Sequence, residues 1–141
     1  MIPAEKSSFS FVEFKVQKSH FTFLDFIGTE LGISFNASGK HFVKTNIFKL
    51  FLTVNVQTAQ DKKDFIEIET ESTFAIKAEL TEMEGLMKYF VTNAPALVFP
   101  YIRSYISTLT TQSGNKPILL PTMNLIGLAE QLRKNIETVT D

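Results

Sequence analysis

Few residues of this chain combine the types and spacing that catalysis or metal binding requires. Neither His20 nor His41 lies near a serine or aspartate in a pattern that suggests a catalytic triad. Cysteine is absent, which excludes disulfides, thiolate nucleophiles and sulfur-ligated metals. The six glycines are dispersed, so they form no phosphate-binding loop. We therefore expect no catalytic residue, no metal and no cofactor, and we interpret both histidines as surface or strand-end residues.

A strip of acidic side chains is the arrangement that could bind a cation. Glu67, Glu69 and Glu71 alternate along a predicted strand, so their side chains share one face, with ~7 Å between successive members. No histidine or asparagine at ligand spacing joins them. A solvated acidic face, or a docking strip for a basic partner, is therefore favoured over a metal site.

The charge balance argues against nucleic acid and membranes as partners. With 14 basic and 15 acidic residues, the formal net charge is -1, and no strong field attracts either partner. Residues 11–18 mix aromatics with lysines, as binders of single-stranded nucleic acid do, but core packing explains these phenylalanines. Residues 1–8 lack the apolar core of a signal peptide, and no stretch approaches the ~20 apolar residues of a membrane span. We expect a cytoplasmic protein that does not insert into membranes.

Phenylalanine is unusually frequent, with 14 residues and no tryptophan. Such side chains build a large core, because each buries much area without a polar group. Alternatively, some of them lie on a surface that captures apolar segments of another protein. The composition leaves both interpretations open.

Alternation of apolar and polar residues predicts four strands in the first half of the chain. Their apolar positions are Val12, Phe14 and Val16, continued by Phe21 and Phe23; Leu31, Ile33, Phe35 and Ala37; Phe48, Leu50, Leu52, Val54 and Val56; and Ile66, Ile68, Phe74, Ile76 and Ala78. The change of parity in the first strand predicts a β-bulge near residues 18–20. The connections are short and polar, which favours an antiparallel sheet, because parallel pairing needs long crossovers.

The second half has the three- and four-residue spacing of helices. One apolar stripe comprises Phe99, Ile102, Ile106 and Leu109; a second comprises Val98, Tyr101 and Tyr105; a final helix carries Leu125, Leu128, Leu132 and Ile136. Because proline is tolerated only in the first turn of a helix, Pro100 places the start of the long helix near Ala96. A separate short helix is predicted over residues 86–91, and Asn124 could cap the final helix.

These elements predict a single α+β domain over residues 1–141, with a four-stranded antiparallel sheet followed by a long helix and a C-terminal helix. A helix that is apolar on two sides is usually buried on two sides, so the long helix predicts self-association. The residues expected at this oligomer interface are Tyr101, Ile102, Tyr105, Ile106 and Leu109.

The segment from Asn93 to Asn124 resembles the SecB family of protein-export chaperones. The positions that carry the resemblance are Pro95, Leu97-Val98-Phe99-Pro100-Tyr101, Arg103, Gly114, Pro117, Leu120-Pro121 and Asn124. Upstream, residues 65–68 and 74–76 are similar to the last strand of that family. The order and lengths of the strands also agree, so the resemblance covers nearly the whole chain.

The resemblance implies a homotetramer, built as a dimer of dimers, that holds unfolded preproteins in the cytoplasm and delivers them to the ATPase SecA. It implies apolar grooves for client polypeptides, with the lining Phe23, Phe26, Ile27, Leu31, Ile33, Phe35, Leu125, Leu128 and Leu132. It also implies a contact with SecA through Phe65 and Glu67.

The sequence departs from the family pattern in ways that affect these expectations. The loop between the first two strands is shorter than usual and the family tryptophan is missing, which predicts a narrower groove. Ser19 and Leu24 stand where acids are expected for the SecA contact, and the chain stops at Thr140-Asp141, with an abbreviated C-terminal extension. These departures favour the holding function over dedicated delivery to SecA.

Two other functions remain open at this stage. SecB-like chaperones also protect single antitoxins in toxin–antitoxin systems, and this chain fits that role. The third hypothesis is a carrier or enzyme that binds a small ligand on an α+β sheet. It predicts an enclosed pocket and a monomer or simple dimer instead of a tetramer.

Overall fold

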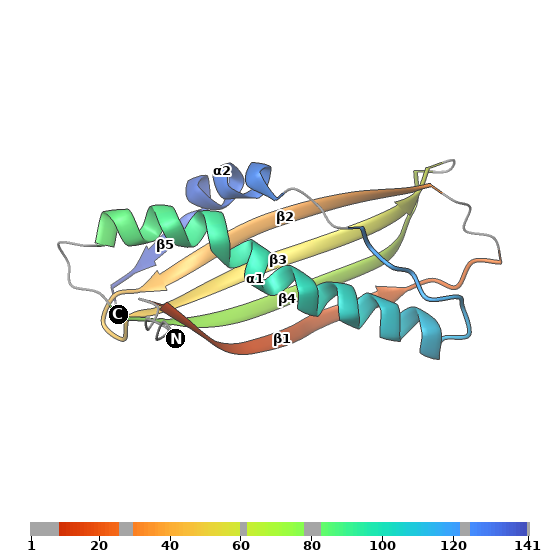
Figure 1. Ribbon diagram of the computed structural model, residues 1–141, viewed down its shortest axis with the longest axis horizontal. Coiled ribbons are helices and arrows are strands. Elements are labelled where there is room, and N and C mark those ends of the chain that lie inside the picture. The colour runs from red at the N-terminus through yellow and green to blue at the C-terminus, as the bar shows by residue number, and fades with distance from the viewer. Residues whose placement is uncertain (1–8, 26–29, 60–61, 78–82, 122–124, 141) are drawn as a thin grey trace, which may run out of the picture.

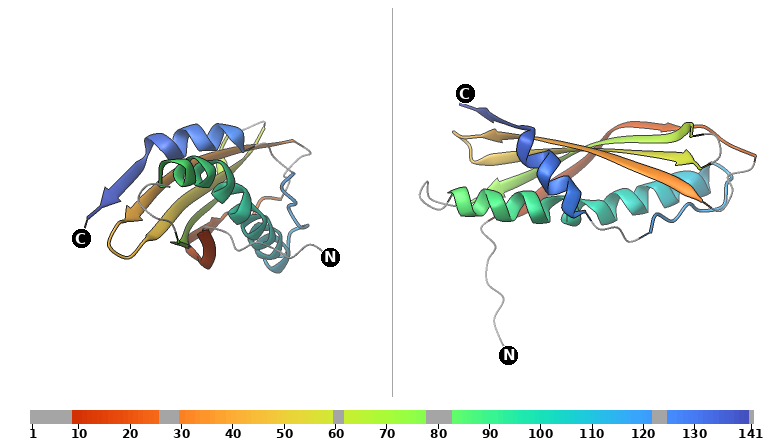
Figure 2. Two further views of the ribbon diagram at one scale, coloured as in Figure 1. Left: turned by 60° about the vertical axis from the view of Figure 1, so that its left-hand side comes forward. Right: turned by 90° about the horizontal axis from the view of Figure 1, so that it is seen from above.

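The chain folds into a long twisted sheet that carries its helices on one face (Figures 1 and 2). The computed structural model describes residues 9–25, 30–59, 62–77, 83–121 and 125–140. Its elements, in chain order, are β1 (Phe9–Phe21), β2 (Leu31–Phe42), β3 (Ile47–Thr58), β4 (Asp64–Ile76), α1 (Met83–Gln112), α2 (Ile126–Lys134) and β5 (Ile136–Val139). The expected α+β order of four strands, a long helix and a C-terminal helix is confirmed.

The sheet has the strand order β1-β4-β3-β2-β5. The first four strands pair antiparallel, as predicted. The fifth was not predicted: β5 pairs in parallel with β2, from Gly39 opposite Ile136 to Phe42 opposite Val139. The prediction that Ile136 belongs to the final helix is therefore wrong. The unpaired backbone groups along the edge of β2 offer this short segment a ladder, so it leaves the helix.

Two irregularities in β1 set which of its side chains reach the core. The register of β1 on β4 shifts between Phe11 and Glu13 and again between Val16 and Lys18. The second shift lies next to the predicted bulge, whereas the first was missed. Val12 was expected in the core but is 62% exposed at this first shift. Phe11 takes the inward place and stacks on Phe74, with ring centroids 5.0 Å apart.

The main core lies between α1 and the central strands. Alternate residues of β3 and β4 face the helix and are buried, which removes each large side chain from water and contributes about 1.5–3 kcal/mol. The buried members are Phe48, Leu50, Leu52, Val54 and Val56 of β3, Ile66, Ile68, Phe74 and Ile76 of β4, and Phe90, Ala94, Val98, Ile102 and Ile106 of α1. Within the described part of the chain, no helix is both long and apolar enough to cross a bilayer.

Helix α1 begins much earlier than its prolines suggest. The predicted start near Ala96 and the separate short helix before it are both wrong, because one helix runs from Met83 and contains Pro95 and Pro100. In Figure 1 the helix changes direction in its first half, and a proline explains such a bend. A proline inside a helix costs about 3 kcal/mol. Packing of the first three turns against the sheet offsets this cost.

Aromatic rings contribute to that packing. The Phe90 ring lies 4.0 Å from the Phe48 ring, 5.0 Å from the Phe74 ring and 5.3 Å from the Phe9 ring, measured between centroids. Two of these pairs, with Phe74 and with Phe9, are edge-to-face, the geometry that aromatic quadrupoles favour. Phe90 therefore fixes the first half of α1 on the sheet.

Candidate functional site

The apolar side chains of the first half of β2 lie at the margin of the core. Leu31, Ile33 and Phe35 point to the same face as α1, because their partners in β3 include the buried Val54 and Val56. All three are half-buried and pack against the core. In Figure 1, α1 runs obliquely across the sheet toward β1 and away from the start of β2, while its Phe99 ring still lies 5.7 Å from the Phe35 ring, measured between centroids. The structure thus gives the predicted β2 lining partial access to solvent.

The other predicted lining residues are divided between the surface and the core. Phe23 is 53% exposed just beyond β1, and Leu125 is half-buried at the start of α2. Leu128 and Leu132 face inward and are 8% and 0% exposed, so within this subunit they hold α2 in place. The predicted lining residues Phe26 and Ile27, like the predicted cap Asn124, lie outside the described residues.

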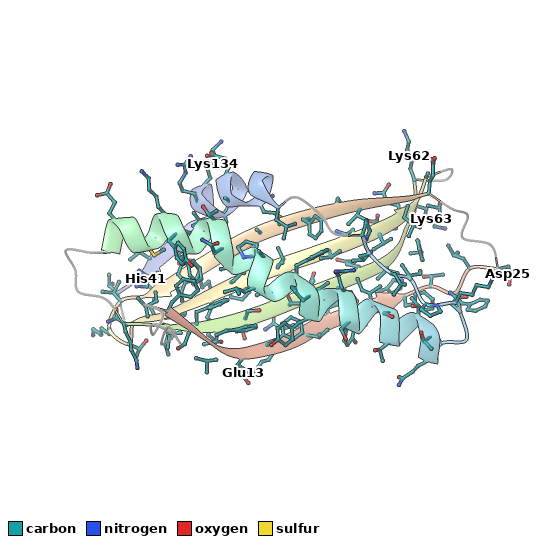
Figure 3. All side chains as sticks on the ribbon, in the orientation of Figure 1. Glu13, Asp25, His41, Lys62, Lys63 and Lys134 are labelled. Atoms are coloured by element: carbon teal, nitrogen blue, oxygen red, sulfur yellow. The ribbon has the colours of Figure 1, made fainter. Side chains whose placement is uncertain are left out.

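The register of the sheet aligns the two strand ends that carry predicted client-binding residues, the end of β1 and the start of β2. Phe21 of β1 is opposite Ile66 of β4, which is opposite Val56 of β3, which is opposite Ile33 of β2. One line across the sheet therefore connects the end of β1 with the start of β2. Figure 3 shows the charged residues Lys62, Lys63 and Asp25 at this same end of the molecule.

A polar clasp holds α2 beside the edge of β2. The backbone N–H of Ala37 donates to Oε1 of Gln131 at 3.1 Å, and Nε2 of Gln131 donates to Oδ1 of Asn36 at 2.8 Å. The N–H of Gly39 donates to the carbonyl of Asn135 at 3.1 Å, where β5 takes over the edge. The clasp holds α2 beside the middle and second half of β2. Sequence reasoning missed it, because the partners lie more than 90 residues apart and carry no local signal.

The opposite face of the sheet is polar and its charges are balanced. Nζ of Lys18 lies 3.5 Å from a carboxylate oxygen of Glu67, and Nζ of Lys49 donates to Glu71 at 3.4 Å. Lysines of the neighbouring strands thus accompany the acidic strip. The spacing of these lysines along their strands could have indicated the pairing. Among the described residues, no three His, Asp or Glu side chains gather where a metal could bind. Phe65, predicted beside Glu67 on this face, is only 2% exposed.

The predicted oligomer interface on α1 also splits into two groups. Ile102 and Ile106 are fully buried against the subunit's own sheet. Tyr101 is 52% exposed, and Tyr105 and Leu109 are half-buried. These three therefore form the part of the predicted interface that a second subunit can reach.

Beside Tyr101, aromatic side chains of β1 extend the accessible surface of α1. The Tyr101 ring lies 5.2 Å from the Phe11 ring and 5.4 Å from the Phe14 ring, measured between centroids. On the same helix Leu97 is 45% exposed. An apolar strip on α1 and β1 thus remains open in the single chain.

His41 is buried at the end of the sheet where β5 joins, as Figure 3 shows. Its Nε2 atom has no hydrogen-bond partner among the described residues. Burial disfavours the charged imidazolium and lowers the pKa of His41 below the ordinary value of 6.5. Between the folded and unfolded pKa values the unfolded chain binds more protons, so stability rises with pH and is lost as the pH falls below 6.5.

We therefore expect the urea midpoint of the protein to decrease as the pH is lowered from neutrality through the range below 6.5. In the His41→Phe variant the midpoint should change less with pH over the same range, whatever its absolute stability. His20→Gln, which alters the exposed histidine of β1, serves as the control and should keep the wild-type slope. Equal slopes for His41→Phe and the wild type would contradict the assignment.

The chain is similar to known proteins along most of its length. The family model described as preprotein translocase subunit SecB matches residues 12–135. An uncharacterized protein of Methanocaldococcus jannaschii is 29% identical over 97 residues, which cover 64% of this chain and 61% of that protein. The protein-export protein SecB of Anaplasma phagocytophilum is 28% identical over 95 residues, or 64% of this chain and 60% of the relative. The matched regions thus span about three fifths of these relatives' own length.

A solved structure shares the fold. The SecB-like chaperone Rv1957 of Mycobacterium tuberculosis, in complex with a ChAD peptide from the HigA1 antitoxin, superposes with a TM-score of 0.68. The match covers 83% of this chain and 88% of the other, with 15% sequence identity. At this identity the likeness establishes the architecture alone: a sheet with a long helix across one face and a C-terminal helix beside it.

Proposed function

Because the chain belongs to the SecB family, we propose that it is an ATP-independent chaperone that holds unfolded polypeptides by their apolar segments. The observation that supports this most is the half-burial of Leu31, Ile33 and Phe35 in the first half of β2. Apolar side chains that are held by the fold yet remain open to solvent can bind a partner without a conformational change in β2. The function requires binding alone and no chemical step.

The energetics of such a surface favour weak, repeated contacts. Burying apolar area contributes about 25 cal/mol per Å², so a segment that covers several hundred Å² gains several kcal/mol. Ordering the client and its side chains cancels much of this gain. Affinity for one site is therefore modest, and several sites on one oligomer raise it through effective concentration. A folding client escapes because it buries its own apolar segments first.

Suppression of aggregation is the experiment that tests this function. A chemically unfolded client is diluted into buffer with and without the purified protein, in the absence of nucleotide, and its light scattering is followed. We expect scattering to fall in proportion to the amount of protein, and added ATP to change nothing. Undiminished scattering at excess protein would contradict the holding function.

We propose a homotetramer, a dimer of dimers, that uses the accessible part of α1. Tyr101→Asp places a charge in the strip beside Phe11, and burying that charge at a subunit contact is costly. We expect the variant to shift from tetramer to smaller species in sizing combined with light scattering. Thr92→Asp, at an exposed position elsewhere on α1, is the matched control and should remain assembled. A wild type that is monomeric at micromolar concentration would contradict the assembly.

A second role within the same function is protection of one antitoxin. The structural relative described above was solved with an antitoxin peptide, which is the observation that favours this role. A pull-down from the native cell that yields one dominant partner would support it, whereas many unrelated unfolded proteins would support general holding.

Delivery to SecA in the cytoplasm is the remaining proposal from the family. Glu67 is the member of the predicted contact pair that lies on the surface, and Lys18 already accompanies it. Phe65 is buried beside it and offers no apolar side chain to a partner. Binding to purified SecA that Glu67→Lys abolishes would support the contact, and wild-type protein that fails to bind SecA would exclude it.

A further inference from the structure

The connection that follows α1 is a strap across the apolar face of the sheet. We use this name for residues 115–121, which form neither helix nor strand. Gly114, with a φ of +92°, turns the chain at the end of α1. Figure 1 shows the segment leaving that end and returning across the sheet toward β2. The strap thus starts at the end of the sheet where the proposed client surface lies and crosses from there toward β2.

Side chains of the strap alternate between the core and the solvent. Ile118 is 6% exposed, Leu119 is 72% exposed and Leu120 is 0% exposed. Such alternation is typical of an extended chain that lies on an apolar surface. Ile118 and Leu120 belong to the same apolar cluster against which Leu31 and Ile33 pack. Figures 1 and 2 show the strap passing beside β2, so the strap covers apolar core near the residues proposed to bind clients.

The strap cannot become a full strand of the sheet. Pro117 and Pro121 have no N–H to donate, which prevents a continuous ladder of backbone hydrogen bonds. A side chain of α1 holds the middle of the strap. The N–H of Ile118 donates to Oγ1 of Thr110 at 3.0 Å, and this hydroxyl donates to the carbonyl of Ile106 at 2.9 Å. Two aliphatic side chains and this hydroxyl hold the segment in place.

We propose that the strap is an internal substitute for the client. In the empty chaperone it covers apolar surface beside β2, and an unfolded segment with aliphatic side chains at alternate positions displaces it. This inference rests on the proposed holding function. The strap keeps the empty protein from presenting a large apolar patch, which would otherwise promote aggregation. It also competes with every client, so fixing the strap must weaken binding and loosening it must strengthen binding.

A reversible lock tests the first of these consequences. A depression of about 300 Å³ is lined by Leu119 and Leu120 of the strap and by Ser107 and its neighbours on α1. The chain has no cysteine, so Leu119→Cys with Ser107→Cys gives a unique pair for a short, reducible bifunctional thiol reagent. The probe is fluorescently labelled lactalbumin, kept unfolded by reduction and carboxymethylation. We expect the lock to weaken probe binding by about tenfold or more, and reduction to restore it, which shows that the protein stays folded.

A nearly isosteric pair of variants tests the second consequence. Thr110→Val removes the hydroxyl that accepts from Ile118, and we expect it to tighten probe binding about threefold. Thr111→Val is the matched control, because the hydroxyl of Thr111 donates to the carbonyl of Ser107 at 2.7 Å, within α1. The control should bind the probe like the wild type.

The outcomes separate this inference from the proposed function. If the wild type binds the probe but the locked form binds equally well, the strap does not compete and the inference is overturned while the holding function stands. Equal affinities for Thr110→Val and Thr111→Val overturn it as well. A wild type that binds no unfolded probe in either state overturns both the inference and the function on which it rests.

Discussion

Ile33→Asp should weaken the binding of unfolded clients by about tenfold or more while leaving the oligomer assembled. Ile33 lies near the start of β2, where it is half-buried against the core. A client segment that covers this position would have to desolvate the new carboxylate without supplying a partner for it. The affinity is measured by fluorescence anisotropy with an unfolded, labelled client, and the assembly by sizing with light scattering.

The matched control for this substitution is Ser34→Asp. Ser34 is exposed on the polar face of the same strand, because neighbouring residues of a strand point to opposite faces. The Ser34→Asp substitution adds the same charge one residue away from Ile33. Equal losses of affinity in both variants would therefore indicate a general charge effect. Undiminished binding by Ile33→Asp at matched concentration would remove β2 from the client surface.

Phe90→Ala should be the most destabilising single change, at about 3–5 kcal/mol of unfolding free energy. The Phe90 side chain is 1% exposed and packs against three other rings, so its removal leaves a cavity where α1 meets the sheet. We expect a large decrease in the urea midpoint. We also expect faster amide exchange in the first half of α1, because its prolines leave that half dependent on tertiary packing.

Tyr89→Ala provides the comparison for this effect. Tyr89 precedes Phe90 on the same turn of α1 but is 55% exposed, with its ring 5.5 Å from that of Phe9. Its removal should cost about 1 kcal/mol or less. Similar losses for both variants would show that the cluster around Phe90 does not hold the first half of α1.

Local patterns predicted most of the sheet because a half-buried strand repeats its signal at every second residue. Leu50, Leu52 and Val54 have that period, and the structure buries all three. The start of α1 was mispredicted because a local rule about Pro100 was overruled by packing of Phe90, ten residues earlier. No local pattern marks β5 either, since four residues carry too little periodicity and their pairing with β2 is non-local.

The candidate site was likewise predictable only in part. The sequence placed Leu31, Ile33 and Phe35 on one face of a strand, but their partial exposure depends on the path of α1 across the sheet. The burial of Leu128 and Leu132 likewise follows from the clasp that docks α2. The solvent exposure of a side chain depends on the whole fold. Composition and spacing could therefore identify candidate residues, but they could not predict which of these remain accessible.

Site-specific photo-crosslinking is the most direct test of the claim that the first half of β2 captures unfolded polypeptides. Benzoylphenylalanine is introduced at Ile33 in one variant and at Ser34 in another, and each is irradiated with an unfolded, labelled client. We expect a strong crosslink from position 33, competed by unlabelled unfolded protein, and little from position 34. Equal crosslinking from both positions, or crosslinking from position 34 alone, would contradict it.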